Sequence, residues 1–279
     1  MKISLIKPSD SLKDVVKHYL VIESLDLNEK LWLLPNAGNF ILFNPGLVAL
    51  LDKYDTGKEA FLLPKDFSVA FKAKNIVRLS INEETKLTHP VVGVELLPTG
   101  CNRLFADENT DRKGVYALLK DCIKEREVSF DKLYDFKSID EQITYIEKGL
   151  LSLKQSAACM NETCDVIERV IDYIEETLYK VNVSDILEKF KYSRTSLERD
   201  FKKTVGYTPK EFIQIRRFGI IFIYLMTNGY DFMKLEYDFF DQSHMNKAFK
   251  KFIDIPPSKL QAFVKDNNIQ IYQLFQAHE

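Results

Sequence analysis

Two stretches of this chain repeat one pattern at a fixed offset of 48 residues, Ser193 to Pro209 and Asp241 to Pro257 (241 − 193 = 48). Each holds a helix-capping residue, a large apolar residue, a phenylalanine, a pair of lysines and a proline. The matched residues are Ser193 and Asp241, Leu197 and Met245, Phe201 and Phe249, Lys202-Lys203 and Lys250-Lys251, and Pro209 and Pro257. Independent loops would not keep this register, so the chain is predicted to contain two copies of one supersecondary unit.

Each copy is predicted to form two short helices joined by a tight turn. In the first copy a helix begins near Asn182 or Ser184, and Ser193 is placed to cap the helix after the turn. Leu197 and Phe201 lie one helical turn apart in this second helix, so both are expected to be buried, with polar and cationic side chains opposite. This is helix-turn-helix anatomy. The two units are predicted at about residues 183–204 and 231–252.

A long helix is predicted between the two units. Thr208-Pro209-Lys210-Glu211 combines a capping box with proline at the first helical position, and apolar residues continue at helical spacing to Asn228-Gly229. About 18 residues at 1.5 Å each give a rod of roughly 27 Å. Such a rod can hold two recognition helices about one DNA turn apart, ~34 Å, in successive major grooves.

The charge of the chain is distributed unevenly. The formal net charge is −2, yet residues 180–265 hold 16 Lys and Arg against 10 Asp and Glu, which leaves 23 basic and 31 acidic residues elsewhere. A basic segment joined to an acidic one is typical of a polyanion-binding module attached to another domain.

The first part of the chain reads as short strands separated by turn residues, which predicts an antiparallel sandwich or a small barrel. The expected strands are Phe40–Phe43, Leu47–Leu51, Ile76–Ile81 and Val91–Leu96. Helical spacing predicts helices at Leu12–Tyr19, Val115–Ile123, Ile139–Leu153 and Val166–Leu178, and helices from there to the end of the chain.

The predicted fold class is therefore α+β with two domains. Residues 1–157 are expected to form an antiparallel β sandwich or small barrel, of which a cupin-like barrel is one form, with flanking helices. Residues 158–279 are expected to form an all-α domain of two helix-turn-helix units joined by a long linker helix. The boundary is placed in the polar stretch around residues 154–163.

Several function classes lack support in the sequence. No segment approaches the ~20 apolar residues that a membrane helix needs, and the N-terminal apolar run is too short for a secretory signal. No nucleophile elbow, P-loop, dinucleotide fingerprint or paired-histidine motif is present, so no catalytic residue, metal site or cofactor is predicted. The cysteines are expected to be buried free thiols in a reducing compartment: Cys101, Cys122, Cys159 and Cys164.

Residues from about Val166 to Leu260 resemble the DNA-binding domain of the AraC/XylS family of bacterial transcription regulators. The first copy has the family's capping residue, large apolar residue, arginine, phenylalanine, lysine and Gly-x-x-Pro ending. The second copy has its Phe-x-Asp-Gln-Ser-His stretch at Phe239–His244. The start of the chain is loosely similar to an uncharacterised N-terminal domain of some members, at Pro35–Phe43 and Leu97–Gly100.

This chain departs from the family pattern at several positions. Glycine is usual in the turn of each unit, where this chain has Lys191 and Asp238. A small alanine is usual at the contact between the two helices, where Leu187 and Lys234 stand, and Asp254 replaces the glycine of the second ending. The second unit is therefore the more degenerate of the two.

The resemblance implies contacts to DNA at the outward-facing positions of both second helices. The candidates for base contacts are Thr195, Glu198, Arg199, Gln242, Asn246 and Lys247. The candidates for phosphate contacts are Arg194, Lys202, Lys203, Ser243, Lys250 and Lys251. Arg199 is the strongest base candidate because arginine can bind guanine bidentately. For Glu198, an ion pair with Lys202 one turn later competes with an interaction with a cytosine amino group.

These observations favour a sequence-specific transcription regulator that binds double-stranded DNA in the cytoplasm. The N-terminal domain would then sense a signal or mediate dimerisation, with a small-molecule effector, RNA polymerase and a second copy of the chain as further partners. One alternative is a ligand-binding or protein-interaction module whose second helix-turn-helix no longer reads DNA. Another is an enzyme built on the β domain, which would require a polar pocket with a perturbed titratable group.

Overall fold

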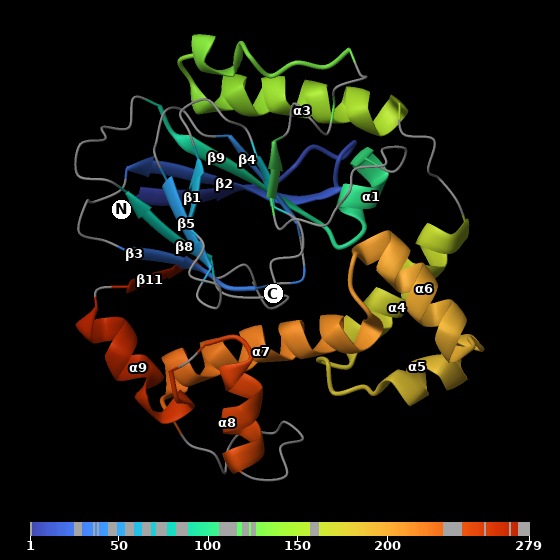
Figure 1. Cartoon of the computed structure of the whole chain (residues 1–279). Helices are drawn as coiled ribbons and strands as arrows, with labels where there is room; N and C mark the ends of the chain where they lie inside the picture. Colours follow the sequence, from blue (N-terminus) through green and yellow to red (C-terminus); the bar gives the residue numbers. More distant parts are fainter. Residues whose placement is uncertain are drawn as a thin grey trace.

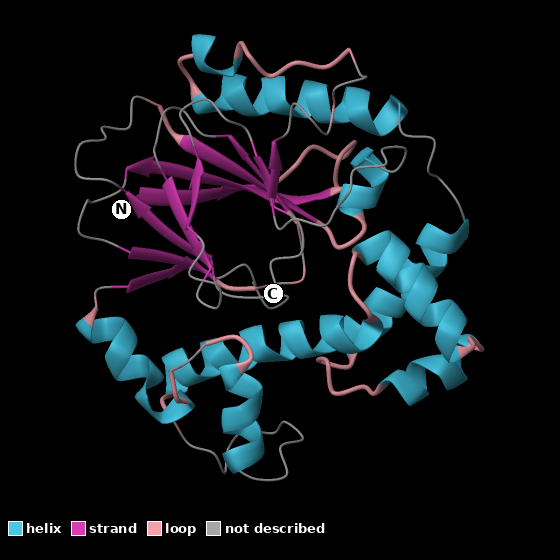
Figure 2. Cartoon of the chain, viewed as in Figure 1, coloured by secondary structure: helices cyan, strands magenta, loops and turns pink. Residues whose placement is uncertain are grey.

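The computed structural model places the strands in one part of the molecule and most helices in another (Figures 1 and 2). It describes residues 2–24, 30–35, 37, 39–43, 49–53, 59–62, 68–70, 77–81, 89–105, 116–118, 123, 127–156, 162–230, 242–253, 255–267 and 269–272. The predicted fold class is confirmed in outline, because a β-rich N-terminal part is followed by a mainly helical C-terminal part.

The β-rich part contains two sheets. The first sheet, in spatial order, consists of β1 (Lys2–Ile6), β2 (Val16–Ser24), β9 (Val91–Leu96), β4 (Phe40–Phe43), β7 (Ser68–Ala70) and β10 (Tyr116–Leu118). The second consists of β11 (Ile269–Tyr272), β3 (Lys30–Leu33), β8 (Val77–Ile81), β5 (Ala49–Lys53) and β6 (Glu59–Leu62). Among the described strands every pairing is antiparallel except that of β11 with β3, which is parallel.

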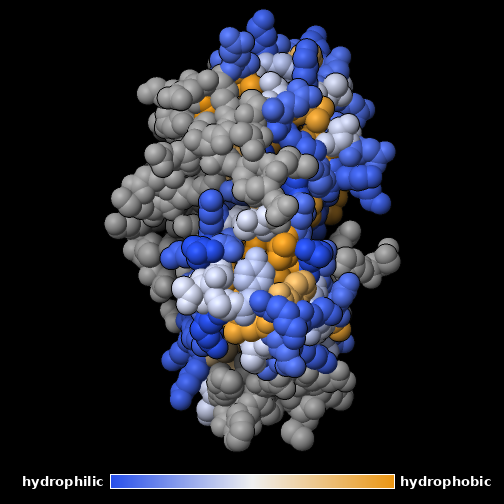
Figure 3. All heavy atoms as spheres, turned by 90° about the vertical axis from the view of Figure 1, so that its right-hand side faces the viewer, coloured by the Kyte–Doolittle hydropathy of each residue, from blue (hydrophilic) through white to orange (hydrophobic). Residues whose placement is uncertain are grey.

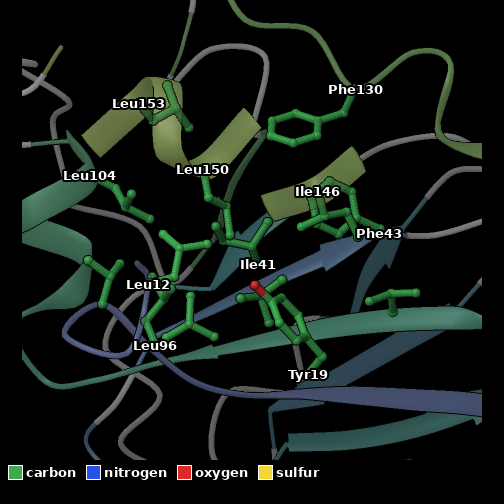
Figure 4. Close-up of a cluster of buried hydrophobic side chains, with 14 of the residues drawn as sticks. Leu12, Tyr19, Ile41, Phe43, Leu96, Leu104, Phe130, Ile146, Leu150 and Leu153 are labelled. Carbon is green, nitrogen blue, oxygen red and sulfur yellow. The ribbon is translucent and has the colours of Figure 1, made fainter. Parts of the chain in front are cut away.

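Helix α3 (Ile139–Ser156) covers one face of the first sheet (Figure 1). Successive side chains of a strand point to opposite faces, so alternate residues of β2, β4 and β9 meet this helix. Figure 4 shows this core, where Tyr19, Ile41 and Leu96 from the sheet lie opposite Ile146 and Leu150. The predicted amphipathic helix at Ile139–Leu153 is therefore confirmed.

Two predicted helices in the N-terminal part are wrong. Residues 10–15 form turns, and the chain from Val16 onward is strand β2, hydrogen-bonded between β1 and β9. Leu12 and Tyr19 are nonetheless fully buried, so their apolar spacing reflected a turn followed by a central strand. Likewise Tyr116–Leu118, inside the helix predicted at Val115–Ile123, is strand β10 paired with β7. In both places pairing within the sheet overrides a short helical pattern.

The helical part is arranged along α7 (Pro209–Asn228). Helices α4 (Glu162–Glu176), α5 (Val183–Phe190) and α6 (Arg194–Val205) share a core with the first half of α7. Helices α8 (Gln242–Lys250) and α9 (Pro257–Asp266) share another core with its second half. The predicted linker helix is confirmed, and Thr208 and Glu211 form its capping box, with Gly229 at its end.

The two parts of the molecule touch at both ends of α7. At one end, α1 (Gly100–Phe105) packs beside α4 and α6 (Figure 1). At the other end, Trp32 and Leu34 join the core formed by α7, α8 and α9. Strand β11 follows α9 and extends the second sheet of the N-terminal part. Helices were expected to the end of the chain, but alternating Ile269 and Ile271 suit a strand on the edge of β3.

The predicted boundary between residues 157 and 158 lies outside the described residues. In the part of the chain that the structure describes, no helix is long and apolar enough to cross a membrane. Cys101 and Cys164 are buried, as predicted, whereas Cys122 and Cys159 lie outside the described residues.

Candidate nucleic-acid interface

The geometry of the first helix-turn-helix unit follows from its caps. Asn182 caps α5 in a capping box with Asp185. Lys191 ends this helix in the left-handed conformation with φ of 56°, where a glycine would be less strained. Ser193 then caps α6, and its hydroxyl accepts from the backbone N–H of Ser196 at 3.1 Å. The predicted turn and cap are confirmed.

Helix α6 has a buried face and a basic exposed face. Leu197 and Phe201 have no exposed surface, and the Phe201 ring lies 5.5 Å from that of Phe212 on α7, edge to face. Among the residues proposed for DNA contacts, Glu198 is partly exposed and the others on this helix are exposed: Arg194, Thr195, Arg199, Lys202 and Lys203. Figure 3, which looks onto the side carrying α4, α5 and α6, shows a largely hydrophilic surface with smaller apolar areas.

Both arginines of α6 lie next to carboxylates. The Arg194 Nη1 and Glu198 Oε1 atoms are 4.0 Å apart, so the structure pairs Glu198 with the preceding turn and not with Lys202. The Arg199 Nε donates to Asp200 Oδ1 at 2.8 Å. This hydrogen bond raises the pKa of the Arg199 guanidinium further above its usual value. The interaction with Asp200 was not predicted from the sequence.

Helix α8, like α6, has a buried face and an exposed face. Met245 and Phe249 are buried, as predicted from their match to Leu197 and Phe201. Asn246 is partly exposed, and the other described candidates are exposed: Ser243, Lys247, Lys250 and Lys251. The side chains of Gln242 and His244, and all of residues 231–241 with the predicted turn, lie outside what the structure describes.

Arg216 and Arg217 in α7 were counted only as part of the basic segment, but Arg216 binds the end of α4 and Arg217 binds the turn that follows it. Arg216 Nη2 lies 3.1 Å from Glu175 Oε1, and its side chain is 6% exposed. Arg217 donates through Nη2 to the Tyr179 carbonyl oxygen at 2.6 Å. The burial of the Arg216 side chain could have been predicted, because Arg216 lies one helical turn after the apolar Phe212 and so on the same face of the helix. These contacts hold α4 against the linker helix.

The described residues hold no group of three or more His, Cys, Asp or Glu side chains that could bind a metal ion. An open depression of about 450 Å³ lies on the outer side of α3, lined by Thr144, Glu147, Lys148, Leu151, Ser152 and Gln155. Glu147 there accepts hydrogen bonds from Tyr19 at 3.1 Å and from the Ser9 backbone at 2.8 Å. Glu147 thus holds the Ser9 backbone and Tyr19 against α3.

Comparison with known protein families matches residues 186–262 to the family described as helix-turn-helix domain. The chain is 28% identical over 102 residues to the multiple antibiotic resistance protein MarA of Escherichia coli strain K12, covering 36% of this chain and 80% of MarA. It is 26% identical over 102 residues to the uncharacterised HTH-type transcriptional regulator YbfP of Bacillus subtilis strain 168, covering 36% of this chain and 35% of YbfP.

Among solved structures, the chain is similar to an apo form of a ToxT variant from Vibrio cholerae, with a TM-score of 0.44 and 16% identity over 88% of this chain and 97% of that one. A second similar structure is wild-type ToxT bound to an unsaturated fatty acid, with a TM-score of 0.42 and 16% identity over 88% and 94%. The geometry of α5, α6, α7 and α8 agrees with the match over residues 186–262. The C-terminal part of this chain therefore contains a helix-turn-helix domain, in agreement with the resemblance of its sequence to the AraC/XylS family.

Proposed function

We propose that this protein is a sequence-specific DNA-binding transcription regulator in which α6 enters the major groove. The observation that carries this proposal is the division of α6 within a helix-turn-helix domain. Leu197 and Phe201 fix the helix to the core, while Arg194, Arg199 and Lys202 are exposed. A helix held by one face and basic on the other suits insertion between phosphate backbones.

The candidate residues of both second helices then divide into two roles. Thr195, Glu198 and Arg199 of α6, with Gln242, Asn246 and Lys247 of α8, would read base edges. Six other residues would contact phosphates, which position the protein without specifying sequence: Arg194, Lys202, Lys203, Ser243, Lys250 and Lys251.

The linker helix supports simultaneous binding of both units. Helix α7 has 20 residues, which at 1.5 Å each correspond to about 30 Å. The two units pack on opposite halves of this helix, around Phe212 and around Phe222. This length is close to the ~34 Å that separates successive major grooves on one side of the duplex.

The N-terminal domain would regulate this DNA-binding domain. Its contacts at both ends of α7 support this role, because α1 contacts α4 through Arg103 and Glu168, and β3 contacts α9 through Trp32 and Phe263. A small-molecule effector, a second copy of the chain and RNA polymerase are the partners that such regulation would involve, and the cytoplasm is the location that it would require.

The proposal is tested with the full-length protein and random-sequence duplexes of about 20 bp. We expect binding whose affinity falls steeply with salt, and repeated selection should enrich one sequence. Arg199→Ala should weaken binding to the enriched sequence about tenfold or more. Lys148→Ala, which removes an exposed charge from α3, is the matched control and should bind as the wild type does. The absence of measurable binding to duplex DNA at low salt would refute the proposal.

A further inference from the structure

The hydrogen bond between Arg199 and Asp200 differs from the usual ion pair on a helix. Side chains that are adjacent in sequence diverge by about 100° around the axis, so neighbours do not normally face each other. Arg194 and Glu198 form the usual pair, one turn apart and at the longer separation of 4.0 Å. Arg199 instead bends sideways along the helix surface to reach Asp200, at 2.8 Å. The guanidinium of Arg199 is thus directed by its neighbour.

The Asp200 side chain is less exposed than the Arg199 side chain to which it is hydrogen-bonded. The Asp200 side chain is 16% exposed, whereas that of Arg199 is 69% exposed. Asp200 also lies close enough to Tyr192, in the turn before α6, to affect it. Burial raises the pKa of the Tyr192 hydroxyl, and the negative charge of Asp200 raises it further. The carboxylate, which belongs to α6, is therefore largely covered and lies near the turn that precedes the helix.

We propose that Asp200 is a positioning residue that holds Arg199 for recognition of a guanine. A guanidinium has N–H donors on Nε, Nη1 and Nη2. Asp200 engages Nε, which leaves the two Nη groups at the end of the side chain to donate to O6 and N7 of guanine. This inference rests on the proposed function and specifies how one of its base contacts is made.

Asp200 favours the recognition of guanine, but its negative charge should weaken binding to DNA of any sequence. A carboxylate beside the arginine that meets DNA repels phosphates whatever the base sequence. Removing Asp200 should therefore strengthen binding to unrelated duplexes while it weakens the preference for guanine. A residue that only stabilised the fold would weaken both kinds of binding together, so the two changes of opposite sign identify a positioning role.

The experiment compares full-length wild type, Asp200→Ala and Asp200→Asn by selection from random 20 bp duplexes, followed by affinity measurements on the enriched sequence and an unrelated duplex. Asp200→Ala should lower the preference for guanine at one position about fivefold to tenfold and raise affinity for the unrelated duplex about twofold to fivefold at low salt. Asp200→Asn retains an acceptor without the charge, so it should raise the unrelated affinity equally and keep part of the preference.

Glu188→Gln is the matched control, because it removes an exposed carboxylate from α5 of the same unit. It should leave the base preference unchanged, and thermal unfolding followed by circular dichroism should show all variants folded. An Asp200→Ala protein that keeps the wild-type preference at every position, or that loses both kinds of binding alike, overturns the inference while the proposed function stands. A wild type that enriches no sequence overturns the proposed function and this inference with it.

Discussion

Arg103 Nη2 lies 2.6 Å from Glu168 Oε1, and this ion pair joins the N-terminal domain to α4 of the helical domain. Thr99 donates to the same Glu168 oxygen at 2.7 Å. Arg103 is 7% exposed and also lies 3.7 Å from Asp14. A single arginine thus links carboxylates from both sides of the contact. Breaking it leaves a poorly hydrated charge behind, which makes this contact sensitive to substitution.

We predict that Arg103 and Glu168 are energetically coupled. Arg103→Ala and Glu168→Ala should each lower the free energy of unfolding by about 1 to 3 kcal/mol, less than for a fully buried pair because Glu168 is partly exposed. Urea denaturation of both single variants and the double variant should give a coupling energy of about 1 kcal/mol. Additive effects would show that the ion pair contributes nothing. A charge-reversed pair should not restore wild-type stability, because Asp14 would then face a glutamate at residue 103.

The other interdomain contact can be followed through Trp32, the only tryptophan of the chain. Its side chain is 2% exposed, and its ring lies 6.0 Å from that of Phe263 on α9. We expect native fluorescence at short wavelength. Ile269→Asn places a polar group in this apolar core, so it should shift the emission to longer wavelength.

Two controls locate the effect on Trp32. Lys265→Ala changes an exposed residue of α9 and should leave the emission unchanged. Arg103→Ala should also leave it unchanged, because the α1–α4 contact lies at the other end of α7 (Figure 1). Emission that responds equally to Arg103→Ala and Ile269→Asn would mean that the two contacts open together.

The helical domain could be predicted largely because its signals are local. Caps such as Ser193 and Thr208, and apolar pairs such as Leu197 and Phe201, act within one or two turns of helix. The repeat then placed α8 by analogy with α6. The proposed contacts to DNA lie on these two helices; they come from the family resemblance and stay a prediction.

What the sequence did not reveal depends on residues far apart in the chain. His18 and Glu95 are partners across β2 and β9, with 2.7 Å between Nε2 and Oε2, and neither residue alone indicates a pair. Trp32 meets α9 only in the folded molecule. The helix expected at Leu12–Tyr19 was wrong because spacing alone cannot distinguish a buried helix from a turn that enters a central strand.

At Gly149, in the middle of α3, the gain in helix propensity from an alanine can be compared with the cost of overpacking. An alanine there would gain about 1 kcal/mol in helix propensity. Its methyl group would, however, collide with the Phe130 ring, which is buried against this helix. Overpacking costs about 1 to 3 kcal/mol, so Gly149→Ala should lower the free energy of unfolding, as measured by urea denaturation. In a Phe130→Leu background the same change should be neutral or stabilising, and a cost that persists there would contradict this explanation.

Asp172 predicts a pH dependence of stability. Burial and the nearby charges of Glu175, Glu168 and Glu176 raise its pKa above the usual value of 3.8. The folded protein therefore binds this proton more tightly than the unfolded chain does, so the ionised form destabilises the fold at neutral pH. Asp172→Asn should raise the free energy of unfolding at pH 7 by a few tenths of a kcal/mol, about 0.5 at most, because the side chain is exposed and screened.

This gain should shrink as the pH falls through the raised pKa, and it should vanish below about 3.8, where Asp172 is protonated in both states. Urea denaturation at several pH values, with low salt to limit screening, measures the difference between variant and wild type. Glu188→Gln on α5 is the matched control for loss of one exposed carboxylate, because Glu188 is not among the residues that raise the pKa of Asp172. A gain that grows as the pH falls would contradict the assignment, because it would mean that ionised Asp172 stabilises the folded protein.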